Sequence, residues 1–189
     1  MSKNNKFSSN LQKLGKAMMM PIAVMPAAGL LLRLGAPDIF NIAWMFAAGN
    51  AIFGHLPIIF AIGIAIGLAD DNNGVAGLAA AVGYFVLTEV AVTFNAKIDM
   101  GVLAGIIVGI LSGYLYNKYK SIRVPDFLGF FGGKRFVPII TSFYTLIIGV
   151  GAGYIWPHIQ DIINNAGNVI AHSGSIGAFF YGVLNRLLI

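Results

Sequence analysis

The sequence predicts an all-α, polytopic membrane protein with five transmembrane helices and the start of a sixth. Of its 189 residues, 58% are hydrophobic and 10% are charged, and the mean hydropathy is +0.81. A soluble domain carries about 25% charged residues, so these few charged side chains cannot cover a surface that faces water. The long uncharged runs lack the alternation of membrane β-strands, which favours helices.

The uncharged runs define the predicted spans, because a helix needs about 20 apolar residues to cross about 30 Å of hydrocarbon. Five runs reach or approach this length: residues 17–34, 51–69, 74–94, 100–116 and 137–156. A sixth run begins near Ser175 and is still apolar at Ile189, so we expect the sequence to be truncated there. We expect the first run to be an uncleaved helix rather than a signal peptide, because it is long and more spans follow.

Lysine and arginine residues predict the orientation of the spans, because they are enriched in cytoplasmic loops. Four lie in residues 1–16 and five in residues 117–136, whereas the opposite side carries Arg33 and Lys97. The N-terminus and residues 117–136 are therefore predicted to be cytoplasmic. Residues 1–16 are expected to be either an amphipathic helix on the membrane surface or a disordered tail.

The fourth run contains four glycines at strict four-residue spacing. Gly101, Gly105, Gly109 and Gly113 fall close to one face of a helix. Small residues on such a face let two helix backbones approach closely in lipid. The spacing predicts a close helix contact, either within one chain or between two.

Catalytic and metal-binding patterns are sparse. The chain has no cysteine, so it has neither a thiolate metal site nor a phosphocysteine. No histidines or carboxylates have metal-ligand spacing, and we predict no metal and no cofactor. Glu89, inside the third run, is either a proton or substrate group or a structural residue near the far interface. A channel, a secondary transporter and a group-translocating permease all remain open on these observations.

Residues 124–139, VPDFLGFFGGKRFVPI, place a cationic, aromatic and turn-rich segment between uncharged runs. This segment resembles the membrane (IIC) domain of phosphotransferase-system sugar permeases of the glucose/N-acetylglucosamine family. Similar matches are LQKLGKAMMMPIAVMPAAGLLLRLG (11–35), LPIIFAIGIAIGLA (56–69), VGYFVLT (82–88), MGVLAGIIVGILSG (100–113) and NRLLI (185–189). LLLRLGAPDIFN and IDMGVLAGII resemble the N-acetylglucosamine-specific branch, and the resemblance covers nearly the whole chain.

The resemblance implies a homodimer in a bacterial inner membrane that imports an N-acetylglucosamine- or glucose-type sugar. As the complete enzyme II, such a protein is a protein-phosphohistidine–sugar phosphotransferase, in which phosphate passes through IIA and a cysteine of IIB to the sugar 6-hydroxyl. Residues 17–189 would then be the N-terminal scaffold and dimerisation part of the IIC domain, inactive by itself. The family's sugar-binding arginine corresponds to Arg186, whereas its histidine and glutamate motifs do not occur in these residues.

The same resemblance gives the 124–139 segment two possible roles. Lys134, Arg135, Phe130 and Phe131 could meet anionic phospho-IIB or shape the inner gate. Alternatively, they could serve only as a topology signal and interfacial anchor. The competing functions are an ion-gradient-driven secondary transporter and a membrane scaffold without transport; nucleic-acid binding is disfavoured because the basic residues do not form a polar face.

Overall fold

The computed structural model of the chain describes residues 3–172. These residues form helices throughout, joined by turns and short loops. The helices are α1 (Lys3–Ile22), α2 (Met25–Gly35), α3 (Ala43–Gly54), α4 (Leu56–Leu68), α5 (Gly74–Phe94), α6 (Gly101–Tyr119), the 3-10 helices η1 (Asp126–Phe131) and η2 (Gly133–Arg135), and α7 (Phe136–His172). The predicted all-α class is confirmed.

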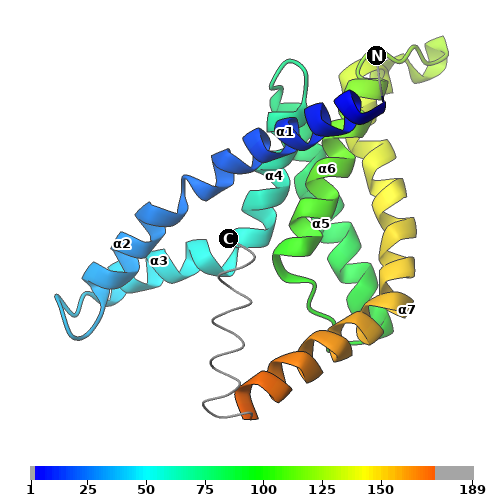
Figure 1. Cartoon of the computed structure of the whole chain (residues 1–189). Coiled ribbons are helices and arrows are strands. Elements are labelled where there is room, and N and C mark those ends of the chain that lie inside the picture. Colours follow the sequence, from blue (N-terminus) through cyan, green and yellow to red (C-terminus); the bar gives the residue numbers. More distant parts are fainter. Residues whose placement is uncertain (1–2, 173–189) are drawn as a thin grey trace.

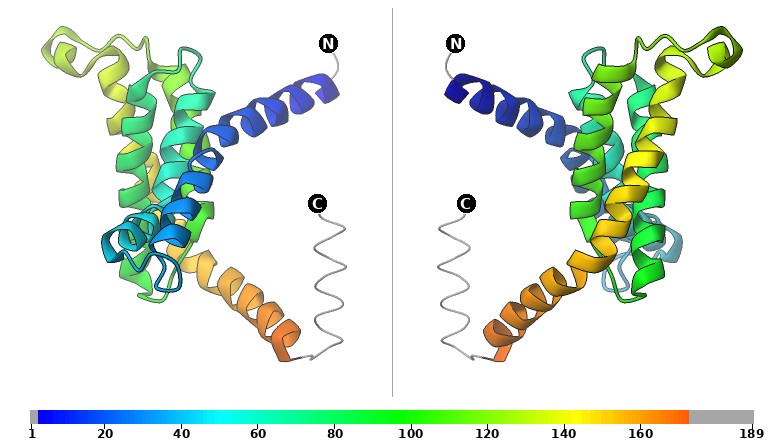
Figure 2. Two further views of the ribbon diagram at one scale, coloured as in Figure 1. Left: turned by 90° about the vertical axis from the view of Figure 1, so that its left-hand side faces the viewer. Right: turned by 90° about the vertical axis from the view of Figure 1, so that its right-hand side faces the viewer.

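The centre of the fold is a bundle in which α4, α5, α6 and the first part of α7 run side by side (Figures 1 and 2). Helix α5 packs against α7, and α6 packs against α4 and α5. Helix α1 packs across α4, while α2 and α3 pack against each other and project from one side (Figure 1). Small residues fill much of the bundle interior, including Ala61, Ala76, Ala80 and Ala104, all with exposed fractions of 0%.

Four helical stretches are long and apolar enough to cross a membrane: Leu11–Gly35, Gly74–Phe94, Gly101–Tyr119 and Gly133–Ile162. A fifth crossing exists if α3 and α4, which meet at a bend of 57°, together form one broken span. The prediction of a membrane protein with several spanning helices is thus confirmed. The predicted sixth run lies outside the described residues.

The prediction of a single helix over residues 51–69 is wrong, because this run is divided between the end of α3 and all of α4. Helix α4 has only 13 residues, which is about 20 Å at 1.5 Å per residue and shorter than the hydrocarbon layer. Pro57 lies in its first turn. Because proline lacks an N–H and its ring clashes with the carbonyl four residues earlier, a helix cannot continue straight through it. The chain therefore bends at His55, between α3 and α4.

Helix α7, which corresponds to the fifth predicted span (residues 137–156), is longer than predicted. The run was expected to end at Trp156, before Pro157, but α7 continues to His172 with Pro157 inside it. The helix changes direction between its yellow and orange parts (Figure 2), as expected for an internal proline. Two side chains near the proline hold the loop before α6: Trp156 Nε1 donates to the Asp99 carbonyl (3.1 Å) and Gln160 Nε2 donates to the Lys97 carbonyl (2.9 Å).

Three of the four evenly spaced glycines lie against α4 of the same chain. A methyl group on Gly105 would overlap the Pro57 carbonyl, and one on Gly109 would lie 2.9 Å from the Ala61 carbonyl oxygen. A methyl group on Gly113 would lie 2.7 Å from Leu68 Cβ. The fourth, Gly101, makes no such contact, since it begins α6 with a φ of +49°. The contact is therefore within one chain.

A substitution in this face should separate α6 from α4. We expect Gly109→Ala to destabilise the protein by about 1–3 kcal/mol, because the added methyl meets backbone and a β-branched side chain that cannot move aside. Thermal unfolding of the purified chain in detergent measures the loss. The matched control is Gly151→Ala in α7, where an added methyl group meets nothing within 4 Å. Equal losses in the two variants would show that the glycine face is not a tight contact.

Candidate functional site

The basic segments predicted to share one side of the membrane lie at one end of the structure. The turn between α4 and α5, the segment after α6 and the N-terminal part of α1 are all at this end (Figure 2). The turn carries Asp70 and Asp71, and its last residue, Asn73, caps α5 by accepting a hydrogen bond from Val75 N–H (3.0 Å). Asparagine is among the residues most favoured at this position, because its side-chain oxygen accepts from a free N–H of the first helical turn. Two carboxylates thus face a strongly basic segment.

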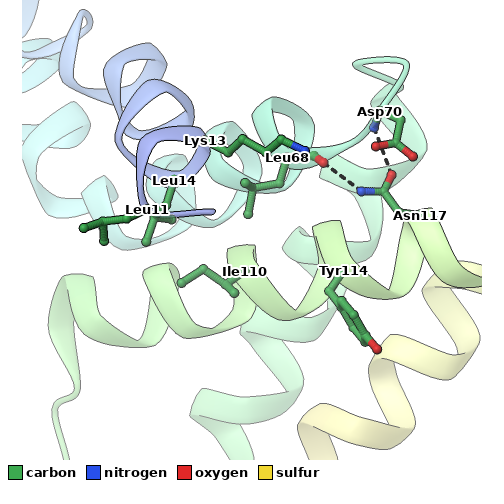
Figure 3. A pocket seen from close by; sticks show the side chains of 8 residues that line it. All are labelled: Leu11, Lys13, Leu14, Leu68, Asp70, Ile110, Tyr114 and Asn117. Atoms are coloured by element: carbon green, nitrogen blue, oxygen red, sulfur yellow. Dashed lines mark hydrogen bonds between the residues drawn. The ribbon is translucent and has the colours of Figure 1, made fainter. Parts of the chain in front are cut away.

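An amide side chain joins the end of α4 to the end of α6. Asn117 Nδ2 donates to the Leu68 carbonyl (2.8 Å), and Asn117 Oδ1 accepts from the Asp70 N–H (2.9 Å) (Figure 3). The Leu68 carbonyl is at the C-terminal end of α4, where backbone carbonyls have no partner within the helix, and the Asp70 N–H follows it in the turn. Asn117 therefore fixes the position of the turn relative to α6.

Two ion pairs hold the basic segment to the turn. Lys120 Nζ lies 3.1 Å from Asp70 Oδ2, and Lys134 Nζ lies 2.9 Å from Asp71 Oδ2. The hydroxyl of the buried Tyr116 also donates to Asp71 Oδ2 (2.9 Å). The hydrogen bond from Lys134 holds the pKa of Asp71 below its usual value, although desolvation acts in the opposite direction. Asp71 therefore stays ionised and ties η2 to α6.

The aromatic part of the segment faces outward. Phe130 and Phe131 are 71% and 44% exposed, and their rings pack edge to face with centroids 5.3 Å apart. The Arg135 guanidinium lies 4.9 Å from the Phe130 ring centroid, and its Nη1 donates to the Phe130 carbonyl (3.4 Å). Arginine can stack on a ring and still present donors to an anion. Arg135, Phe130 and Phe131 together form an exposed cationic–aromatic patch.

The structure thus separates the four residues predicted to act together. Lys134 points to the turn and is paired with Asp71, whereas Arg135, Phe130 and Phe131 form the exposed patch. Arg186, the predicted sugar-binding residue, lies outside the described residues. Glu89 lies exposed on α5, away from this end, and its role remains a prediction.

Sequence reasoning missed Asp71, Tyr116 and Asn117. Their partners are 45 to 63 positions away along the chain, so local spacing does not identify these pairings. One signal was available for Asn117, because it continues the four-residue spacing of Gly105, Gly109 and Gly113. A polar residue at the end of a small-residue stripe can reach the end of the helix that the stripe contacts. No group of three metal-ligating side chains occurs within residues 3–172.

Comparison with known proteins identifies relatives over nearly the full chain. The family model described as phosphotransferase system, EIIC, matches residues 15–189. The N-acetylglucosamine-specific EIICBA component of Escherichia coli (strain K12) is 53% identical over 94% of this chain and 28% of its own length. The N-acetylglucosamine-specific EIICB component of Bacillus subtilis (strain 168) is 50% identical over 96% of this chain and 40% of its own length. The glucosamine-specific EIICBA component of Bacillus subtilis is 50% identical over 95% of this chain and 30% of its own length. The chain therefore spans less than half the length of these relatives.

Proposed function

The chain belongs to the EIIC family of the phosphotransferase system, and we propose that it is the N-terminal scaffold part of the membrane domain of a sugar-importing enzyme II. The observation that carries this proposal is the identity of about half over almost the whole chain to relatives specific for N-acetylglucosamine. The complete protein would transfer phosphate from phospho-IIB to the 6-hydroxyl of the imported sugar. It would thereby act as a protein-phosphohistidine–sugar phosphotransferase.

N-acetylglucosamine is the proposed substrate, and glucosamine is the second candidate. The second is supported by the glucosamine-specific relative, which matches this chain as well as the Bacillus N-acetylglucosamine component does. We propose Arg186 as a residue that binds the sugar, because the rigid fork of donors on its guanidinium suits sugar hydroxyls. Phospho-IIB and, upstream of it, IIA are the proposed partners, and a homodimer is the proposed assembly.

The energy source distinguishes this function from its competitors. Vesicles containing the full-length protein, the carrier proteins and phosphoenolpyruvate should convert labelled N-acetylglucosamine to its 6-phosphate, and an uncoupler should not stop the conversion. Free sugar that accumulates and is released by the uncoupler would instead indicate an ion-driven transporter. Conversion of glucosamine or glucose in preference to N-acetylglucosamine would correct the substrate.

In the full-length protein, Arg186→Ala should abolish sugar binding measured by calorimetry, and unchanged affinity would remove Arg186 from the site.

The exposed patch is the proposed docking surface for phospho-IIB. Arg135 is available to an anion, whereas the charge of Lys134 is matched by Asp71. Arg135→Gln should therefore raise the KM for separately supplied phospho-IIB about five- to tenfold at low salt with little change in kcat, and high salt should remove the difference. Lys97→Gln, at the other end of the bundle, is the matched control. A changed kcat for sugar transfer with an unchanged KM for phospho-IIB would indicate a gate instead.

We also propose that the end carrying the patch faces the cytoplasm. The proposal is supported by the nine basic residues in residues 1–16 and 117–136, against Arg33 and Lys97 at the other end. The chain has no cysteine, so a single introduced cysteine reports its own location. In intact cells, Ser121→Cys should resist an impermeant thiol reagent while Asn95→Cys should react, although both residues are exposed in the structure. The reverse pattern would invert the topology.

A further inference from the structure

A groove opens where α1 leaves the bundle. Ala17 packs closely on α4, because a methyl group on Gly67 would lie 2.8 Å from Ala17 Cβ. Towards its N-terminus α1 then diverges from the bundle (Figure 2). The space between α1 and α6 is a groove of about 400 Å³ with side chains from α1, α4 and α6 along it (Figure 3).

Most of the residues that line this groove are apolar or aromatic, and the polar ones are Lys13, Asp70 and Asn117. Leu14 points from α1 towards Ile110 of α6, and Leu11 and Leu68 line its sides (Figure 3). Tyr114, one turn beyond Ile110, is 61% exposed and lines the groove towards its polar end. An apolar groove that opens to the outside of a membrane protein faces lipid tails rather than water.

Two lysines of α1 lie beside the groove. Lys13 lines the groove itself, and an adjoining hollow of about 360 Å³, which shares Lys13 with the groove, is also lined by Lys16. The ion pairs found within residues 3–172 involve neither lysine. Asp70 also lies at the rim, but its carboxylate is paired with Lys120. Residues three apart on a helix are neighbours, so two like charges there repel unless an anion lies between them.

The polar end of the groove lies at the level expected for lipid headgroups. Lys118 Nζ lies 5.9 Å from the ring centroid of Tyr114 and 5.2 Å from that of Tyr119. Tyrosine and lysine together mark the interface at the end of a spanning helix. Ile110 lies one helical turn deeper along α6 than Tyr114. The groove thus leads from headgroup level into the hydrocarbon.

We propose that the groove binds an anionic glycerophospholipid of the adjacent leaflet. One acyl chain lies along Leu14, Ile110 and Tyr114, and the phosphate lies between Lys13 and Lys16. A free phosphate ion would leave the apolar walls uncovered. A second copy of the chain would bring two more lysines of the same sign to the rim. An anionic lipid matches both the apolar wall and the unpaired cations.

Native mass spectrometry of the purified chain in a neutral detergent tests the site. Phosphatidylglycerol and phosphatidylcholine with identical acyl chains are the probes, so only the headgroup charge differs. Each lysine beside an anionic headgroup is expected to contribute about fivefold, and two give a preference of about twenty-five-fold for phosphatidylglycerol. The Lys13→Gln/Lys16→Gln double variant should lose this preference, while Lys97→Gln should keep it.

A second pair of variants tests the acyl-chain wall independently of charge. Ile110→Trp fills the groove and should reduce retention of both lipids, whereas Leu103→Trp, two turns away on the same face of α6 and outside the groove, should not. Equal retention of the two lipids by the parent chain would overturn the proposal. So would phosphatidylglycerol preference that survives in the double lysine variant, or a dimer that retains no lipid and dissociates in Ile110→Trp.

Discussion

The close approach of α6 to α4 is the contact on which the rest of the structure depends. In lipid, helices gain nothing by hiding apolar side chains from one another, so close van der Waals packing has to hold them together. Gly105, Gly109 and Gly113 allow that packing along the full length of α4. The spacing continues with Asn117, at the point where α4 ends at Leu68. One four-residue repeat therefore supplies both the contact between the helices and the amide that satisfies the end of α4.

This register also determines the charged end of the molecule. Once Asn117 is bonded to the end of α4, the neighbouring Tyr116 lies beside Asp71, and Asp71 in turn receives Lys134. Lys134 lies in η2, directly before α7, and α7 packs on α5. The pairing explains why adjacent cations, Lys134 and Arg135, have different surroundings. One is held by a carboxylate of the turn, and the other remains at the surface over Phe130.

Much of the fold was predictable because hydropathy and small-residue spacing are local properties of the sequence. The helical class and the glycine face follow from them. The error over residues 51–69 arose because average hydropathy takes no account of Pro57, where the missing N–H favours a break. The opposite error occurred at Pro157, where the chain accommodates the missing N–H with a bend instead of ending the helix. Composition cannot separate these outcomes, because packing around each proline decides between them. The ion pairs of the charged end could not be predicted, since they join residues whose proximity results from the register of α4 and α6.

The break at His55 shows how a broken span can be compatible with lipid. A bend exposes backbone groups, and each unsatisfied group would be costly in hydrocarbon. Here the His55 N–H bonds to the carbonyls of Ala51 and Ile52, each at 3.2 Å, and the His55 ring contacts the Ala51 carbonyl through Nδ1 at 2.7 Å. Beyond the break, Gly105 of α6 covers the Pro57 carbonyl so closely that no side chain fits between them. The contact of Gly105 therefore lies next to the break between α3 and α4. It covers the break by placing the backbone of α6 against it. The short α4 and the glycine face of α6 thus depend on each other. The span can break before Pro57 because α6 has no side chain at Gly105 and can pack directly against the start of α4.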